Sequence, residues 1–122
     1  MIRLAGGKNV AEEITDTYWA QIDYEQLLLW DPEYIILPSA AKYTAADVLE
    51  DPNLSECRAV KNGNVYQIPG DAEAWDSPVP GSILGALWLA NILHPELMTA
   101  VDCAGIMDEY YETFYNFTYS EV

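Results

Sequence analysis

Basic residues are scarce in this sequence. Only five of its 122 residues are Lys or Arg, against twenty Asp or Glu, so the formal net charge is −15. From residue 62 to the end there is no Lys or Arg. This charge repels phosphate groups, so nucleic acid and anionic membrane surfaces are poor partners. An acidic face can recruit a cationic ligand or a basic docking surface, although a solvated surface is the more ordinary explanation.

Cysteine and histidine are also scarce, and the familiar catalytic motifs are missing. Cys57 and Cys103 lie far apart, which excludes a disulfide-dense framework and leaves either one bridge or two thiols. His94 is the single histidine, too few for a zinc site built from His and Cys. No metalloprotease, P-loop, serine-hydrolase or dinucleotide-binding motif occurs. The sequence therefore predicts no enzyme, no cofactor and no metal site, with a small enzyme using paired carboxylates as the alternative.

Long apolar runs are lacking as well. The longest, residues 83–93, is too short to span a bilayer, and no apolar segment of the signal-peptide kind precedes Gly6 and Gly7. We therefore expect a soluble mature chain without a signal peptide. Half of the residues are nevertheless apolar, which suits one domain over residues 1–122 with a sizeable core.

The order of predicted elements is typical of an α/β protein. Apolar runs closed by proline predict buried strands at 34–37 and 65–68. Predicted helices cover 24–30 after Asp23, 45–50 after Thr44, 82–93 and 100–116. Strands separated by helices favour parallel pairing through crossovers. Two strands make a poor sheet, so we expect that further strands lie outside this chain.

Two groups of residues are candidates for ligand binding. Tyr18 and Trp19 precede the first predicted helix, where exposed aromatic rings often bind ligands, and Glu25 lies in its first turn. Trp75 and Asp76 follow the second predicted strand, at the sheet edge where α/β proteins hold ligands. The structural alternatives are core packing for the two tryptophans, a helix-dipole role for Glu25, and a capped, proline-rich turn around Asp76.

Several short motifs together resemble one family, the substrate-binding proteins of ABC importers for iron–siderophore, haem and cobalamin-type ligands. Each motif is weak alone, but six occur in the right order with matching gaps over about residues 4–119. They lie at 4–11, 19–28, 30–36, 59–69, 75–78 and 87–96.

The resemblance implies a fold and a location. The fold would be α/β, an open three-layer sandwich with a short, mostly parallel sheet, forming one lobe of a two-lobe binding protein. Residues 1–122 would correspond to the carboxyl-terminal lobe, without the amino-terminal lobe and the linking helix. The full-length parent would be extracytoplasmic, in the periplasm or lipid-anchored at the cell surface. An isolated lobe would also pair with a second copy through its exposed sheet edge or cleft face.

The resemblance also implies a function. The chain would help to deliver an iron complex, haem or cobalamin-like chelate to the permease subunits of an importer; the alternative is a sensor or interaction domain of the same fold. Few arginines are available, which argues against anionic siderophores unless the other lobe supplies the charge. Glu25, six residues after a Trp, would dock on a permease arginine. The implied ligand-binding residues are Tyr18, Trp19, Tyr43, Trp75 and Asp76.

Overall fold

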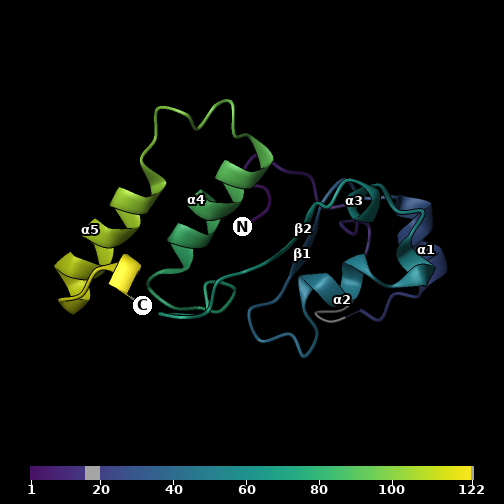
Figure 1. Ribbon diagram of the computed structural model, residues 1–122, viewed down its shortest axis with the longest axis horizontal. Helices are drawn as coiled ribbons and strands as arrows, with labels where there is room; N and C mark the ends of the chain where they lie inside the picture. Colours follow the sequence, from purple (N-terminus) through teal and green to yellow (C-terminus); the bar gives the residue numbers. More distant parts are fainter. Residues whose placement is uncertain (16–19, 122) are drawn as a thin grey trace. The chain divides into compact units, whose positions relative to one another are not determined.

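The computed structural model describes residues 1–15 and 20–121 (Figure 1). The chain divides into two compact units, and each is described by itself. Unit 1 comprises Met1–Lys8 and Pro69–Val122, and unit 2 comprises Asn9–Ile68.

Unit 2 contains the predicted parallel sheet. Strands β1 (Ile35–Leu37) and β2 (Val65–Gln67) pair in parallel, with Ile35 opposite Val65 and Leu37 opposite Gln67 (Figure 1). The chain crosses between them through helix α2 (Ala45–Leu49), the 3₁₀ helix η1 (Pro52–Leu54) and helix α3 (Arg58–Lys61). The prediction of two short strands in parallel is confirmed, and with it the α/β fold class. No further strand occurs in the part of the chain that the structure describes.

Local capping sets where the helices of unit 2 begin. Helix α1 (Tyr24–Trp30) starts where the Asp23 side chain accepts a hydrogen bond from the Gln26 N–H at 2.8 Å, as predicted. At α2, Thr44 and Asp47 form a reciprocal capping box. Helix α3 was not predicted: its N-cap residue Cys57 makes no side-chain cap hydrogen bond, and the Asp31 carboxylate accepts from the Arg58 N–H instead. The core of unit 2 consists of Leu37, Leu54, Cys57, Ala59, Val65 and Ile68.

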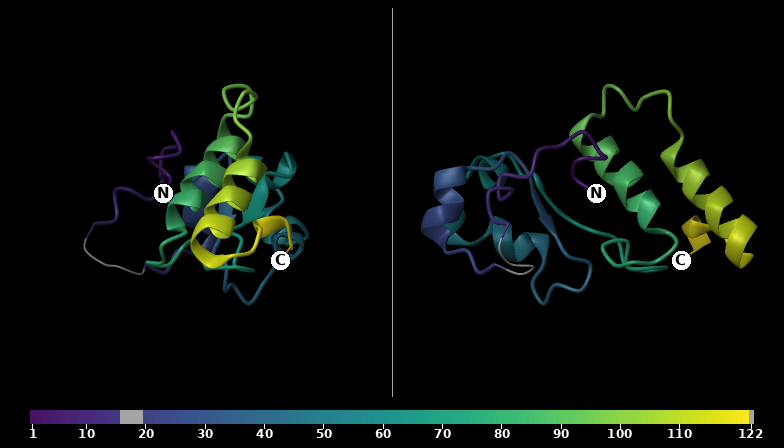
Figure 2. Two further views of the ribbon diagram at one scale, coloured as in Figure 1. Left: turned by 90° about the vertical axis from the view of Figure 1, so that its left-hand side faces the viewer. Right: turned by 180° about the vertical axis from the view of Figure 1, so that it is seen from behind.

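Unit 1 is built on two antiparallel helices that lie side by side (Figure 1 and Figure 2). Helix α4 (Ser82–Leu93) has the predicted bounds, whereas α5 (Cys103–Tyr115) begins three residues later than predicted, because Asp102 caps it. A 3₁₀ helix, η2 (Tyr119–Glu121), follows α5. The core consists of Ala5, Trp75, Leu84, Leu89, Met107 and Tyr111.

Two details differ from the sequence-based expectations for unit 1. Helix α4 is apolar almost all round, which predicts burial under other elements, yet Ile83 is 61% exposed and only one side of the helix is buried. On α5, Met107 and Tyr111 are buried as the apolar pattern predicts, but Phe114 is 69% exposed. Both cysteines are free thiols, Cys57 buried and Cys103 half-buried, so of the two alternatives the structure has thiols.

Candidate ligand pocket

Unit 2 contains a pocket of about 740 Å³ beside β1. Such a volume suits a small organic ligand. Its walls come from the start of α1, one face of β1, the segment before α2, α2 itself and η1. The lining residues are Ile22, Asp23, Tyr24, Leu27, Ile35, Leu37, Tyr43, Asp47, Val48, Asp51 and Leu54.

Simple periodicity explains which residues face the pocket. Ile35 and Leu37 are two positions apart on β1 and therefore share one face of the sheet. Tyr24 and Leu27 are three positions apart and share one side of α1. Tyr43 lies just before the Thr44 cap of α2, after the carboxyl end of β1. The pocket thus reaches the sheet edge where ligands bind in open α/β folds.

The charged lining residues are all acidic. Asp23, Asp47 and Asp51 line the pocket, and none of the described lining residues is Lys, Arg or His. The Tyr24 hydroxyl donates a hydrogen bond to Asp51 Oδ2 at 2.8 Å. Hydrogen bonds from the Asn53 backbone N–H and from Tyr24 lower the pKa of Asp51, while the bond to Asp51 raises the pKa of Tyr24. Asp51 is therefore ionised, and Tyr24 is a neutral donor, at physiological pH.

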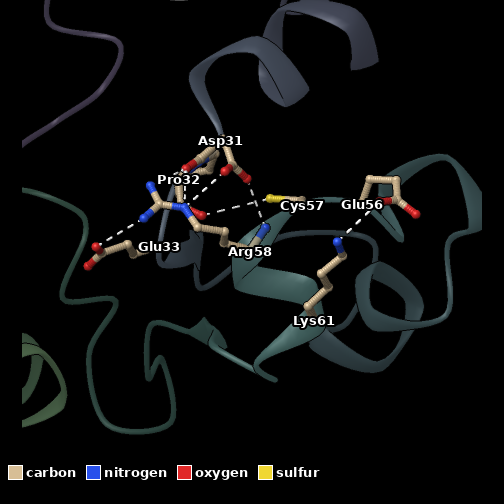
Figure 3. A network of polar contacts seen from close by, with 7 residues as sticks. All are labelled: Asp31, Pro32, Glu33, Glu56, Cys57, Arg58 and Lys61. Carbon is tan, nitrogen blue, oxygen red and sulfur yellow. Dashed lines mark hydrogen bonds and ion pairs between the residues drawn. The ribbon is translucent and has the colours of Figure 1, made fainter.

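Arg58 of unit 2 pairs with acidic groups that do not line the pocket (Figure 3). The Arg58 guanidinium donates to Asp31 Oδ2 at 2.9 Å, to the Asp31 carbonyl at 2.7 Å, and to Glu33 Oε1 at 3.2 Å. The Arg58 backbone N–H also donates to Asp31 Oδ1 at 2.9 Å. We refer to Asp31, Glu33 and Arg58 as the Arg58 cluster. It ties the start of α3 to the segment that leads into β1.

The structure distributes the predicted ligand-binding residues unevenly. Tyr43 lines the pocket and is 49% exposed. Tyr18 and Trp19 lie outside the described residues. Asp76 is exposed, in a turn of unit 1. Glu25, the predicted docking residue, is exposed in the first turn of α1.

Trp75 is a core residue and is not presented to solvent. It is 1% exposed, and its ring stacks on that of Tyr119 with centroids 5.2 Å apart. Its indole N–H donates to the Tyr111 hydroxyl at 2.9 Å, and that hydroxyl donates to Glu73 Oε2 at 2.9 Å. The Tyr115 hydroxyl donates to Glu73 Oε1, also at 2.9 Å. This arrangement, the Glu73 cluster, corresponds to the packing alternative for Trp75.

Sequence reasoning did not single out Tyr24, Asp47 or Asp51 as site residues. Each lies in or beside a short, capped helix, where a polar residue is ordinarily explained by the cap itself. A usable signal was present, because Tyr24 and Tyr43 both fall where a helix starts. In a parallel α/β unit such starts gather at the carboxyl edge of the sheet.

A family comparison identifies the chain. Residues 1–72 match the family model described as periplasmic binding protein. The chain belongs to the periplasmic binding protein family. Its α/β fold with a parallel sheet agrees with this membership, and so does the resemblance found in its motifs.

Individual binding proteins match nearly the whole chain. The molybdate-binding protein MolA of Haemophilus influenzae is 32% identical over 120 residues, which cover 98% of this chain and 34% of MolA. The structure of MolA bound to molybdate has a TM-score of 0.81 and 31% identity, covering 94% of this chain and 35% of that one. CeuE of Helicobacter pylori with Ni(II) bound has a TM-score of 0.85 and 26% identity, covering 98% and 39%.

The chain thus spans little more than a third of the length of these binding proteins. The ligands named for them, molybdate and Ni(II), are not the iron complex, haem or cobalamin expected from the motifs. Within residues 1–15 and 20–121 no group of three or more His, Cys, Asp or Glu side chains could hold a metal ion. The same residues include no helix that is long and apolar enough to span a membrane.

Proposed function

We propose that this chain provides part of the solute-binding site of an extracytoplasmic binding protein that serves an ABC importer, without catalysis. The observation that carries the proposal is the pocket beside β1, because it occurs in a member of a binding-protein family and contains the predicted residue Tyr43. That residues 1–122 form a single lobe is part of the same proposal. We also propose that two copies of the chain pair with each other.

The proposed ligand is an iron complex, haem or a cobalamin-like chelate, as the motif resemblance implies. Tyr43 offers an exposed ring on which a flat chelate can stack. Tyr18, Trp19 and Asp76 are further proposed contacts. Trp75 would first have to leave its core position in the Glu73 cluster. Since MolA and CeuE are named with molybdate and Ni(II), both belong in the set of ligands to be tested.

Glu25 is the proposed docking residue for a permease arginine. Its side chain is exposed, and none of the ion pairs among the described residues includes it. A carboxylate in such a position can pair with arginine and orient the incoming partner.

Ligand binding by the 122-residue chain tests the proposal. Tryptophan fluorescence is titrated with haem, a ferric siderophore, a cobamide, molybdate and nickel–histidine. We expect saturable quenching by at least one of them. Tyr43→Ala should weaken the affinity about 3- to 10-fold, since it removes a half-exposed ring from the pocket wall.

Leu29→Ala is the matched control. Leu29 is 78% exposed on α1 and does not line the pocket, so its removal should leave the affinity unchanged. The proposed ligand class fails if none of the five compounds produces saturable quenching, and the assignment of the site to this pocket fails if both variants weaken binding equally.

A further inference from the structure

The pocket beside β1 carries charge of one sign. In the part of the chain that the structure describes, Asp23, Asp47 and Asp51 are its charged lining residues and none of the lining residues is basic. The three ion pairs among the described residues join Arg58 or Lys61 to Asp31, Glu33 and Glu56, so none of them neutralises the pocket. Lys42, which precedes Tyr43 in the sequence, lies outside the lining, and an anion entering this space would meet three lining carboxylates.

Neutral donors hold the three carboxylates in place. The Asp23 side chain accepts from the Gln26 N–H, and Asp47 Oδ2 accepts from the Thr44 N–H, each at 2.8 Å. Asp51 accepts from Tyr24 and Asn53. Hydrogen bonds from neutral groups orient a carboxylate without cancelling its charge. The negative charges are therefore fixed in position and available to a ligand.

The rest of the wall suits the body of an organic molecule. Two tyrosine rings lie in it, Tyr24 and Tyr43, each 49% exposed. A ring face attracts a positive group, and more so where carboxylates stand nearby. The remaining lining is aliphatic: Ile22, Leu27, Ile35, Leu37, Val48 and Leu54. A bare metal ion would gain little from such walls, and the described residues offer no ligand set for one.

We infer that the pocket takes an organic cation, a protonated amine or quaternary ammonium with an apolar body, and discriminates against oxyanions. The inference rests on the proposed solute-binding function but assigns a different ligand class from the chelates that the motifs imply, one that presents positive charge to Asp23, Asp47 and Asp51. We therefore expect this chain not to bind molybdate, the oxyanion named for MolA.

Three probes that share a benzene ring and differ in charge test the inference. Benzyltrimethylammonium, benzyl alcohol and benzenesulfonate are each titrated into the 122-residue chain by calorimetry, at low and at physiological salt. The cation should bind at least about 10-fold more tightly than the alcohol, the sum of modest gains from three carboxylates and two rings. The sulfonate should show no binding. Added salt should lower the affinity for the cation and leave the affinity for the alcohol unchanged.

Substitutions then locate the cation. Asp51→Asn keeps a side-chain acceptor and removes the charge. It should lower the affinity for the cation about 3- to 5-fold. Tyr43→Ala should weaken it about 2- to 5-fold, and no hydrogen bond or ring contact among the described residues depends on this side chain. Glu50→Gln is the matched control: it removes the same charge one position away, from an exposed residue outside the lining, and should leave the affinity unchanged.

Failure of this inference can be told from failure of the proposed function. Equal affinity for the three probes, preference for benzenesulfonate, or equal losses in Asp51→Asn and Glu50→Gln would overturn the cationic ligand class. If molybdate or a chelate still bound in a Tyr43-dependent manner, the solute-binding function would stand. Absence of saturable binding by every probe and by every compound of the earlier titration would overturn both.

Discussion

The two units of the chain satisfy their carboxylates in different ways. In unit 2 the described ion pairs use Arg58 and Lys61, and the Arg58 cluster is half-exposed at the protein surface. In unit 1 the Glu73 carboxylate accepts from two tyrosine hydroxyls, and one of these, Tyr111, is fully buried and also accepts from Trp75. Cations thus take part in unit 2, beside neutral donors such as Tyr24, whereas the Glu73 carboxylate of unit 1 uses phenols.

The uneven distribution of basic residues explains the difference. Residues 62–122 contain no Lys or Arg, and the only basic residues in the sequence of unit 1 are Arg3 and Lys8, so carboxylates there depend largely on neutral donors. Tyrosine provides a donor and apolar surface in one side chain, so it can satisfy Glu73 and fill the core together. Unit 1 should therefore depend on aromatic packing and on protonated hydroxyls, and unit 2 on ionised groups and on salt.

Removing the Tyr111 side chain is expected to give the largest effect. Tyr111 is 0% exposed, stacks on Phe117 and Tyr119, and joins Trp75 to Glu73. Tyr111→Ala should lower the free energy of unfolding by about 3–5 kcal/mol, because it leaves a cavity and two polar groups without partners. Urea unfolding measures the loss, and hydrogen exchange should locate it in unit 1.

Phe114→Ala serves as its control. Phe114 lies on the same helix but is 69% exposed, so the loss should stay below about 1 kcal/mol. Comparable losses for Tyr111→Ala and Phe114→Ala, or faster exchange confined to unit 2, would contradict the aromatic basis of unit 1.

Alkaline pH should act on the same cluster with a smaller effect, because the rings stay in place. Burial, more than the hydrogen bond to Glu73, raises the pKa of Tyr111 from 10.0 to about 12. The folded chain therefore holds this proton more tightly than the unfolded chain does. The resulting stability is complete below pH 10 and is lost as the pH rises through about 12.

Absorbance of tyrosinate and hydrogen exchange between pH 9 and 12 would follow this transition. Unit 1 should lose protection before unit 2, since Arg58 keeps its charge over this range. Tyr111→Phe removes the titrating group, so its stability should depend less steeply on pH in the same range. An equally steep dependence in that variant would show that another group is responsible.

Breaking the Arg58 cluster should give the smallest effect, and one that depends on salt. Arg58→Ala removes the guanidinium contacts to Asp31 and Glu33 at a half-exposed position and should cost about 1 kcal/mol. Lys61→Ala, which removes a single exposed pair with Glu56, should cost less than about 0.5 kcal/mol. Urea unfolding at low and high salt measures both, and the difference should shrink at high salt. A difference that salt leaves unchanged would point to lost packing of the Arg58 stem.

The sequence predicts those elements whose limits are set locally. Asp23 and Thr44 cap α1 and α2 through contacts three residues away, and proline ends both strand segments. Helix α3 escapes prediction because its start depends on a distant partner: the Arg58 N–H bonds to Asp31, which is close only in the folded chain. Likewise η2 brings Tyr119 onto Trp75.

The site is less predictable than the fold for the same reason. Tyr43 could be proposed from the family resemblance, and it does line the pocket. Trp75 is an aromatic residue in a loop, as a ligand contact would be. Its burial depends on Tyr111, which is distant from it in the sequence. The pocket itself depends on α1, β1 and α2 meeting over one face of the sheet. Apolar periodicity within one segment carries no information about such a meeting.

Helix α3 also affects where and how fast a protease cleaves this chain. Trypsin cuts after Lys and Arg, and Arg58 and Lys61 of α3 are the last such residues, so the whole stretch 62–122 is closed to it. A bond inside a helix must open locally before it can enter a protease active site. Cleavage at Lys61 releases residues 62–122 as one large piece, easily recognised by its mass. The rate at which that piece forms would measure how often the carboxyl end of α3 opens, under native conditions and without any label.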